Sequence, residues 1–255
     1  MSWRRSSALV RHELRILRHD PLPFMLSICL PLVMMWFLRP AMAAIFSATN
    51  GPDDGAAQAV PGMAVLYAMF LVANVAFGFL REVDWRTWSR LRATQATAAD
   101  LVVGKLVPGF VVVTGLLLAL IVAGVRLFSL EMRGSWWAVI ALLAVFGGWL
   151  TACGAVIAAI CRTLPQATAI ANLLTLLLCG IGGVLMPAET LPGWVQFVGP
   201  AAPTSRVMGG LRDTIGGAGL TDIATDLGVL VLWCAATTAL GLWAVGRKMT
   251  AEAVL

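Results

Sequence analysis

Gly104-Lys105 is the only Gly-Lys pair in this 255-residue sequence, and such a pair is where a phosphate-binding loop is first sought. That loop needs a glycine five residues before the pair and a serine or threonine after it. Its backbone amides and lysine cradle the phosphates, and the hydroxyl holds the metal ion. Here Ala99 and Leu106 occupy those two positions. We therefore expect no ATP, Mg²⁺ or other cofactor on this chain.

No other set of side chains predicts catalysis or metal binding. His12 and His19 both lie near the N-terminus, and no serine or cysteine pattern places a nucleophile beside a base and its orienting group. The cysteines form no Cys-x-x-Cys pair and lie in or beside apolar runs, so we expect them to pack as small hydrophobic residues. They are Cys29, Cys153, Cys161, Cys179 and Cys234. The sequence predicts neither an enzyme nor a metal site.

The composition is that of an integral membrane protein. Hydrophobic residues make up 60% of the chain and charged residues 12%, with mean hydropathy +0.88, whereas a soluble domain carries about 25% charged residues. The net charge is +5, but the basic residues cluster beside apolar runs. Positively charged loops explain them better than nucleic-acid binding does.

Six runs are long and apolar enough to cross a bilayer, which takes about 20 residues. They cover residues 22–46, 61–80, 101–125, 135–160, 166–186 and 226–246. We expect an all-α membrane domain over 22–255. With the N-terminus in the cytoplasm, 13 Lys and Arg residues fall on the inner side and 5 on the outer side, out of 18 in total. This asymmetry predicts that both termini are cytoplasmic.

Residues 1–21 form a predicted amphipathic helix ahead of the first span. Apolar residues and arginines recur at helical spacing on adjacent faces, and Pro21 ends the pattern. Such a helix lies along the membrane surface with its arginines on lipid phosphates. The basic segment is longer than that of a usual signal peptide, so we interpret 22–46 as a span that is retained.

Residues 81–94 are charged and rich in tryptophan, yet they lie between two apolar runs. Arg81, Trp85, Trp88 and Arg92 fall on one face of a helix. An ordinary positively charged cytoplasmic loop would explain the arginines. It would not explain Glu82, Asp84 or the length of the segment. A helix that receives force from a cytoplasmic protein explains all of these features.

Polar residues within the spans are candidate sites, because burying them in lipid is costly. Arg39 either contacts an acidic group of a substrate or reaches the outer headgroups, with snorkelling or an ion pair favoured. Asn74 and Asn172 either line a cavity or bond a neighbouring helix. A stripe of small residues on the fourth span instead predicts close helix packing. The stripe is Gly147, Thr151, Ala155 and Ala159.

The segment 187–213 is too broken by proline and glycine to span the membrane, and too apolar for a free loop. We expect short helices that re-enter the outer leaflet, buried against the bundle. Trp194 is expected at the membrane interface, packed against the spans.

Two stretches resemble the ABC-2 type transporter permeases, and together they extend the resemblance to nearly the whole chain. The first, FLREVDWRTWSRLRATQATAADLVVGK, matches that family's pattern between the second and third spans, except that Arg86 replaces a glycine and Gln95 a proline. The matching residues are Glu82, Asp84, Thr87, Leu91, Ala93, Thr94, Gly104 and Lys105. The second, residues 182–213, is similar to the family's outer segment. Its matching residues are Gly182, Gly183, Pro187, Leu191, Pro192, Trp194, Pro203, Thr204, Leu211 and Arg212.

The resemblance implies a permease subunit of an ATP-driven exporter in a bacterial cell membrane. Its expected partners are two ATPase subunits, a second permease chain (identical or different) and membrane lipids. It implies a coupling helix made by Glu82, Asp84, Trp85, Thr87, Trp88, Leu91, Ala93 and Thr94. It also implies an outer gate containing Gly183, Pro187, Leu191, Pro192, Trp194 and Pro203. Arg39, Asn74 and Asn172 are candidates for the substrate path.

The expected substrate is a hydrophobic or amphipathic molecule such as a drug, an antibiotic or a lipid, because few charges line the spans. Export of a lipid-linked glycan or a peptide is an alternative within the same class. A membrane anchor or sensor that transports nothing is an alternative from another class.

Overall fold

The computed structural model describes residues 22–48, 55–84, 98–186 and 190–251, and every regular element in these ranges is helical. The long helices are α2 (Leu22–Ala48), α3 (Ala56–Asp84), α5 (Ala98–Leu127), α6 (Trp136–Ile160), α7 (Leu164–Ile181) and α10 (Ala224–Ala251). The short ones are α8 (Gly193–Val198), the 3-10 helix η2 (Gly199–Ala201) and α9 (Pro203–Gly216). Each of the six long helices contains a stretch able to cross a membrane. The predicted all-α membrane fold is confirmed, whereas the surface helix predicted over 1–21 lies outside the described residues.

Two helix boundaries differ from the sequence-based prediction in ways that matter for the site. The second span was expected to start at Pro61, but α3 begins at Ala56 and continues through the proline. Membrane helices tolerate proline because neighbouring groups satisfy the carbonyl it leaves free. The fifth span was expected to reach residue 186, but α7 ends at Ile181, where Gly183 adopts φ 64°. A left-handed residue of this kind stops a helix.

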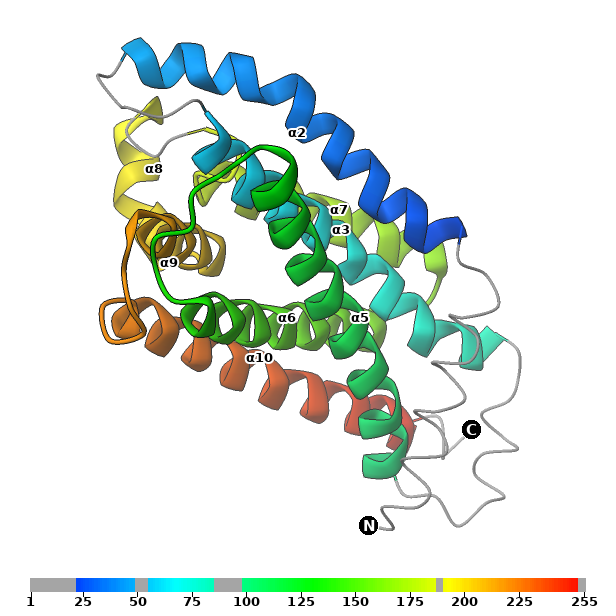
Figure 1. Ribbon diagram of the computed structural model, residues 1–255. Coiled ribbons are helices and arrows are strands. Elements are labelled where there is room, and N and C mark those ends of the chain that lie inside the picture. Colours follow the sequence, from blue (N-terminus) through cyan, green and yellow to red (C-terminus); the bar gives the residue numbers. More distant parts are fainter. Residues whose placement is uncertain (1–21, 49–54, 85–97, 187–189, 252–255) are drawn as a thin grey trace.

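The centre of the bundle is formed by α3 and α6, whose membrane-spanning stretches are mostly buried. The largest fully buried side chains include Met69 of α3, Leu116 of α5 and Phe146 of α6. Around this centre, α2, α7 and α10 expose apolar side chains along much of their length. Figure 1 shows α6 between α5 and α10, with α2 along one side. Outward-facing apolar residues are expected where lipid is the solvent.

Small residues let the central helices approach closely, as predicted for the stripe on α6. A Cβ on Gly147 would collide with Oγ1 of Thr114 on α5, and one on Gly154 would lie 2.6 Å from Cβ of Val75 on α3. The Thr151 hydroxyl donates to the Gly147 carbonyl at 2.7 Å and so needs no partner on another helix. These contacts confirm that the stripe serves helix packing.

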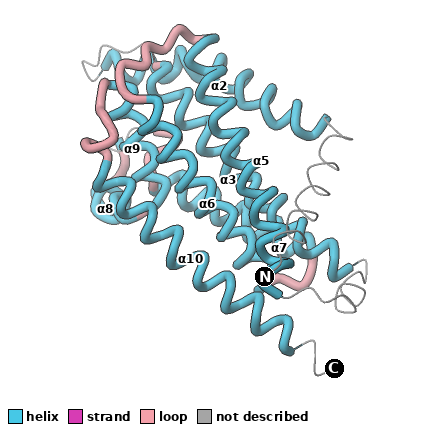
Figure 2. The backbone as a smooth tube through the Cα atoms, turned by 60° about the horizontal axis from the view of Figure 1, so that its bottom comes forward, coloured by secondary structure: helices cyan, strands magenta, loops and turns pink. Residues whose placement is uncertain are grey.

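The short helices all lie at one end of the bundle, which we call the α9 end. There α2, α5 and α7 finish, and α3, α6 and α10 begin. At the opposite end α3 and α10 finish and α5 begins, and Figures 1 and 2 show the two ends well separated. The region between α3 and α5, where the coupling helix was predicted, therefore lies at the end away from α9.

Candidate functional site

Residues 190–216, which we call the cap, consist of three short helices joined at prolines. Pro192 is the N-cap of α8, Pro200 lies in η2, and Pro203 is the first residue of α9. Proline lacks the amide hydrogen needed inside a helix but fits its first turn, so each proline starts a new element. The prediction that prolines divide this segment is confirmed.

The longest helix of the cap, α9, buries one face against the bundle. Val207, Met208 and Leu211 are almost fully buried on that face. Gly210 lies so close to α6 that a Cβ on it would be 2.8 Å from Cδ1 of Leu142. The Thr204 hydroxyl donates to the Leu178 carbonyl of α7 at 2.6 Å. Apolar packing and one hydrogen bond therefore fix α9 on both α6 and α7.

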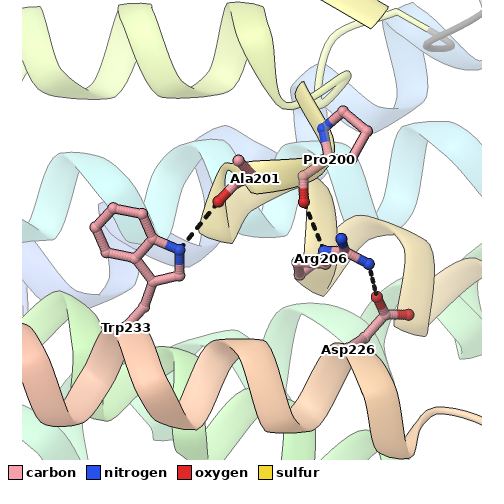
Figure 3. A network of polar contacts seen from close by, with 5 residues as sticks. All are labelled: Pro200, Ala201, Arg206, Asp226 and Trp233. Atoms are coloured by element: carbon pink, nitrogen blue, oxygen red, sulfur yellow. Dashed lines mark hydrogen bonds and ion pairs between the residues drawn. The ribbon is translucent and has the colours of Figure 1, made fainter. Parts of the chain in front are cut away.

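Polar side chains tie the cap to α10 (Figure 3). Arg206 donates through Nε to the Pro200 carbonyl at 2.6 Å and through Nη1 to Oδ1 of Asp226 at 3.0 Å. The indole Nε1 of Trp233 donates to the Ala201 carbonyl at 3.0 Å. These bonds satisfy two adjacent carbonyls of η2, which a 3-10 turn of three residues leaves without helical partners.

A second polar group ties the cap to α3. Gln58, which is 1% exposed, donates through Nε2 to the carbonyls of Gly183 at 3.2 Å and Val184 at 3.1 Å. Its Oε1 accepts from Nε of Arg212 at 2.8 Å and also from Nη2 of the same side chain. Carbonyls can only accept and guanidinium can only donate, so these partners fix the orientation of the amide. The irregular backbone after α7 is thereby satisfied from α3.

The predicted gate residues occupy different environments. Gly183 is buried beneath the cap, Pro203 is buried within it, and Pro192 is exposed at its first helix. Leu191 is half-buried. Trp194 is 65% exposed, and Phe197, which lies three residues further along α8, is 88% exposed. Trp194 therefore does not pack into the bundle of its own chain, which differs from the prediction. Pro187 lies outside the described residues.

The predicted coupling residues lie mostly outside the described residues. The helix α3 continues through Glu82 and Asp84, and α5 begins at Ala98. The remaining ones are Trp85, Thr87, Trp88, Leu91, Ala93 and Thr94, and the structure does not describe them. The prediction of a coupling helix over 81–94 therefore stays a prediction.

Asn74 and Asn172 lie at similar depth on the neighbouring helices α3 and α7. Gly62 packs against the Val184 carbonyl, and the two helices run in opposite directions from there. Asn74 lies twelve residues after Gly62, and Asn172 lies twelve residues before Val184, so the two are equally far along the chain from this contact. Asn74 is exposed and Asn172 half-buried, so neither amide is fully enclosed by the chain.

Aromatic residues extend the exposed face of α3 around Asn74. Phe70 is one turn before Asn74, and Tyr67 is one turn earlier still. The two rings meet edge to face with centroids 6.2 Å apart. An amide beside a pair of aromatic rings is a surface suited to an amphipathic molecule, because the rings bury apolar area and the amide bonds one polar group.

Arg39 lies far from Asn74. A Cβ on Gly55, just before α3, would collide with the Arg39 carbonyl, so Arg39 is level with the start of α3. Asn74 is 18 residues further along that helix, counted from Ala56, or about 27 Å at 1.5 Å per residue. The Arg39 guanidinium instead lies 5.9 Å from the ring centroid of Phe128. The structure therefore separates Arg39 from the two asparagines.

The side chains that hold the cap were not predicted from the sequence to be functional. They are Gln58, Arg206, Asp226 and Trp233. Gln58 was not predicted because the second span was expected to start at Pro61, so Gln58 fell in the loop before it. A weak signal was available for Arg206 and Asp226. They are opposite charges at the borders of two apolar segments, where an ion pair is cheaper than an isolated charge.

The cysteines behave largely as small packing residues. Cys153, Cys161 and Cys179 are buried and Cys234 is half-buried, whereas Cys29 is exposed on α2. Among the described residues no group of His, Cys, Asp or Glu could hold a metal ion.

Comparisons with known proteins place the chain in a family. A model described as "ABC-2 family transporter protein" matches residues 40–243. The chain is also similar to the linearmycin resistance permease protein LnrN of Bacillus subtilis (strain 168), with 30% identity over 196 residues. That match covers 74% of this chain and 49% of the relative, so the chain spans about half the length of the curated protein it matches. Because the family match covers all but the first 39 and last 12 residues and includes the cap, the last third of α2 and most of the other five long helices, the chain belongs to the ABC-2 transporter family.

Proposed function

We propose that this chain is the transmembrane permease subunit of an ATP-driven exporter for a hydrophobic or amphipathic molecule such as a drug, an antibiotic or a lipid. The observation that carries the proposal is the family match over residues 40–243, which covers most of five of the six membrane-length helices and the end of the first. The similar protein is named for resistance to linearmycin, which supports an antibiotic-like substrate. In this proposal two separate ATPase subunits hydrolyse ATP, and the absence of a phosphate-binding loop at Gly104-Lys105 supports this division of roles.

The coupling step would act at the end of the bundle away from the cap. α3 ends at Asp84 and α5 starts at Ala98, so a push on the segment between them moves both helices. Both helices pack on each other and on α6. In this proposal the segment containing Glu82, Asp84, Trp85 and Trp88 lies in the cytoplasm, contacts the ATPase and transmits its movement to the centre of the bundle.

The substrate surface would lie on the exposed face of α3 beside α7. Tyr67, Phe70, Asn74 and Asn172 supply aromatic area and amide groups at the middle of the spans. A second permease chain, identical or different, would cover this face and complete the path. Arg39 is remote from it, and its stacking on Phe128 supports a role at the outer headgroups instead.

The cap would re-enter the outer leaflet and close the path from outside. On α10 the apolar run starts after Asp226, and Trp233 is seven residues further, or about 10 Å along the helix. Since Trp233 bonds Ala201 and Arg206 bonds Asp226, η2 lies beside the outer part of this run. The satisfied carbonyls of η2 and of Gly183 and Val184 support this placement, because lipid tolerates irregular backbone only when its polar groups have partners.

The test is reconstitution of the permease with its ATPase in lipid vesicles. Candidate amphipathic antibiotics and lipids should stimulate ATP turnover and should move across the membrane away from the ATPase side. A complex that hydrolyses ATP at one rate with every candidate, and moves none, would overturn the proposal in favour of a membrane anchor or sensor.

A further inference from the structure

The two polar groups that hold the cap differ in their access to water. On the α3 side Gln58 is 1% exposed, and its amide bonds two carbonyls and one guanidinium. On the α10 side the side chains of Arg206 and Asp226 are 28% and 18% exposed, and Trp233 is 43% exposed. The cap therefore has one attachment that the chain encloses and one that is partly exposed, and Asp226 of the exposed attachment lies before the apolar run of α10.

This difference decides which attachment opens more easily. Parting Arg212 from Gln58 would leave the enclosed side-chain oxygen of Gln58 without a donor, and a buried acceptor in that state carries the full cost of its desolvation. Asp226 lies in the first turn of α10 at the border of the membrane, so water there can solvate both charges when Arg206 and Asp226 part, and most of the lost interaction is recovered. The α10 attachment is therefore the weaker of the two.

The geometry of the α10 attachment makes it a single unit, which we call the clasp: Arg206–Asp226, Arg206–Pro200 and Trp233–Ala201. Asp226 and Trp233 are two helical turns apart on one face of α10, and Leu230 between them is fully buried. Figure 3 shows Arg206 and Trp233 reaching the adjacent carbonyls of Pro200 and Ala201. Loss of either contact removes a partner from η2 and loosens the other.

Below the clasp, α10 is packed closely on α6. A Cβ on Gly148 would lie 3.3 Å from Sγ of Cys234, and a Cβ on Gly241 would lie 3.5 Å from Cγ2 of Val156. Cys234 directly follows Trp233 of the clasp, and Gly241 lies past the middle of α10, so the close contacts with α6 begin where the clasp ends. Close packing through glycine offers a fixed crossing point about which the first turns of α10 can swing.

We propose that the clasp is a releasable joint, whose opening lets the first turns of α10 move away from η2 and α9 while the cap stays on α3. The proposal rests on the proposed function, in which the cap closes the outer side of the path. The gap that forms beside η2 faces both lipid and the outer surface, so an amphipathic molecule leaves with its apolar part toward lipid.

The test is a distance measurement on the permease alone, in lipid nanodiscs. Spin labels are placed at Phe197 on α8 and Thr225 on α10, which are both exposed, in a cysteine-free variant. The labelled protein is mixed with an excess of unlabelled chain, so that labels on two different copies rarely come close. Pulsed electron paramagnetic resonance then gives the distribution of distances between the two labels of one chain. Arg206→Gln should raise the population at longer distance on the order of fivefold, which is about 1 kcal/mol. Trp233→Phe, which removes the indole N–H together with part of the ring, should shift it in the same direction.

The matched control is Arg133→Gln. Arg133 forms an ion pair with Glu131 at 2.9 Å at the same end of the bundle, with side chains 71% and 76% exposed and no part in the clasp. Its loss should leave the distribution unchanged. The proposal is overturned if Arg206→Gln and Trp233→Phe both give the native distribution, or if Arg133→Gln shifts it equally.

A crosslink tests whether transport needs the opening. A Cβ on Gly209 would lie 3.7 Å from Oδ2 of Asp226, so Gly209→Cys with Asp226→Cys can be joined by a short reducible thiol crosslinker. Export should stop on crosslinking and return on reduction, and undiminished export would overturn the proposal. The distance measurement needs neither ATPase nor substrate. It therefore shows whether the clasp opens even if no export is found and the proposed function fails.

Discussion

Arg212 of α9 donates two hydrogen bonds to Gln58 of α3, a residue 154 positions earlier in the chain. Gln58 in turn donates to the carbonyls of Gly183 and Val184, so one buried amide joins three segments. The three segments are the start of α3, the irregular backbone after α7, and the last half of α9.

We predict that Gln58→Leu destabilises the protein by about 2–4 kcal/mol, because it removes a buried amide that bonds Arg212 and the carbonyls of Gly183 and Val184. Thermal unfolding in detergent measures the loss. Gln166→Leu is the matched control, since Gln166 is exposed at the start of α7 and makes only a local bond to the Arg162 amide. An equal fall in melting temperature for both variants would show that the Gln58 network adds nothing specific.

Gly147→Ala should destabilise the bundle by roughly 1–3 kcal/mol, the cost of overpacking a core. The added methyl would collide with the Thr114 hydroxyl of α5, which is buried and has no hydrogen-bond partner among the described residues. Thr114→Ala should therefore restore much of the stability lost in Gly147→Ala. Gly115→Ala is the control, because a Cβ there meets nothing within 4 Å. Thermal unfolding of the double-mutant cycle checks the coupling, and strictly additive losses would contradict it.

We predict that the α9 end faces the outside of the cell and the opposite end the cytoplasm, from the 13 to 5 asymmetry of Lys and Arg. Single cysteines at Thr221 and at Arg90 in a cysteine-free variant test this orientation. An impermeant maleimide added to intact cells should label position 221, which is exposed in the structure. It should label position 90 only after the cells are opened. The reverse pattern would invert the proposed transport geometry.

The number and type of the long elements could be predicted from the sequence, because a helix that crosses lipid needs about 20 mostly apolar residues and the chain has six such runs. The breaks at Pro192, Pro200 and Pro203 were equally readable, since proline acts locally. The stripe of small residues that begins at Gly147 could be predicted for the same reason, because its four-residue spacing is a property of a single helix.

The contacts that hold the cap could not be predicted, because each joins residues far apart in the chain. Nothing local to Trp233 indicates that it bonds Ala201, 32 residues earlier. Trp194 was expected at the membrane interface and packed against the spans, but the six residues of α8 bury only Val195. The sequence also grouped Arg39 with Asn74 because both are polar residues in spans, whereas their depths differ.

Asn74→Leu should reduce transport without reducing stability. Asn74 is exposed on α3, so leucine there removes a polar group without disturbing the core. We expect a several-fold loss of substrate-stimulated ATP turnover and an unchanged melting temperature. Val111→Asn is the converse control, because Val111 is 47% exposed on α5, outside the proposed path. Equal effects of both variants on turnover would indicate that the exposed face of α3 contacts only lipid.

The coupling segment gives the most direct test of how this chain uses ATP. α3 extends through Glu82 and Asp84 at the end of the bundle away from the cap, so its last turn projects toward the proposed ATPase. Reversing both charges, Glu82→Lys with Asp84→Lys, should weaken co-purification of the ATPase. The loss should be larger at low salt, where charge repulsion is least screened.

The membrane domain of that double variant should stay folded, because the spans pack through their own apolar and small residues. Glu131→Lys with Asp213→Lys is the matched control. It makes the same change of charge with two exposed residues at the α9 end, which a cytoplasmic ATPase does not reach. The control should bind the ATPase as the native chain does. If the Glu82 and Asp84 variant also bound normally and exported normally, residues 81–94 would be a positively charged loop without a role in coupling.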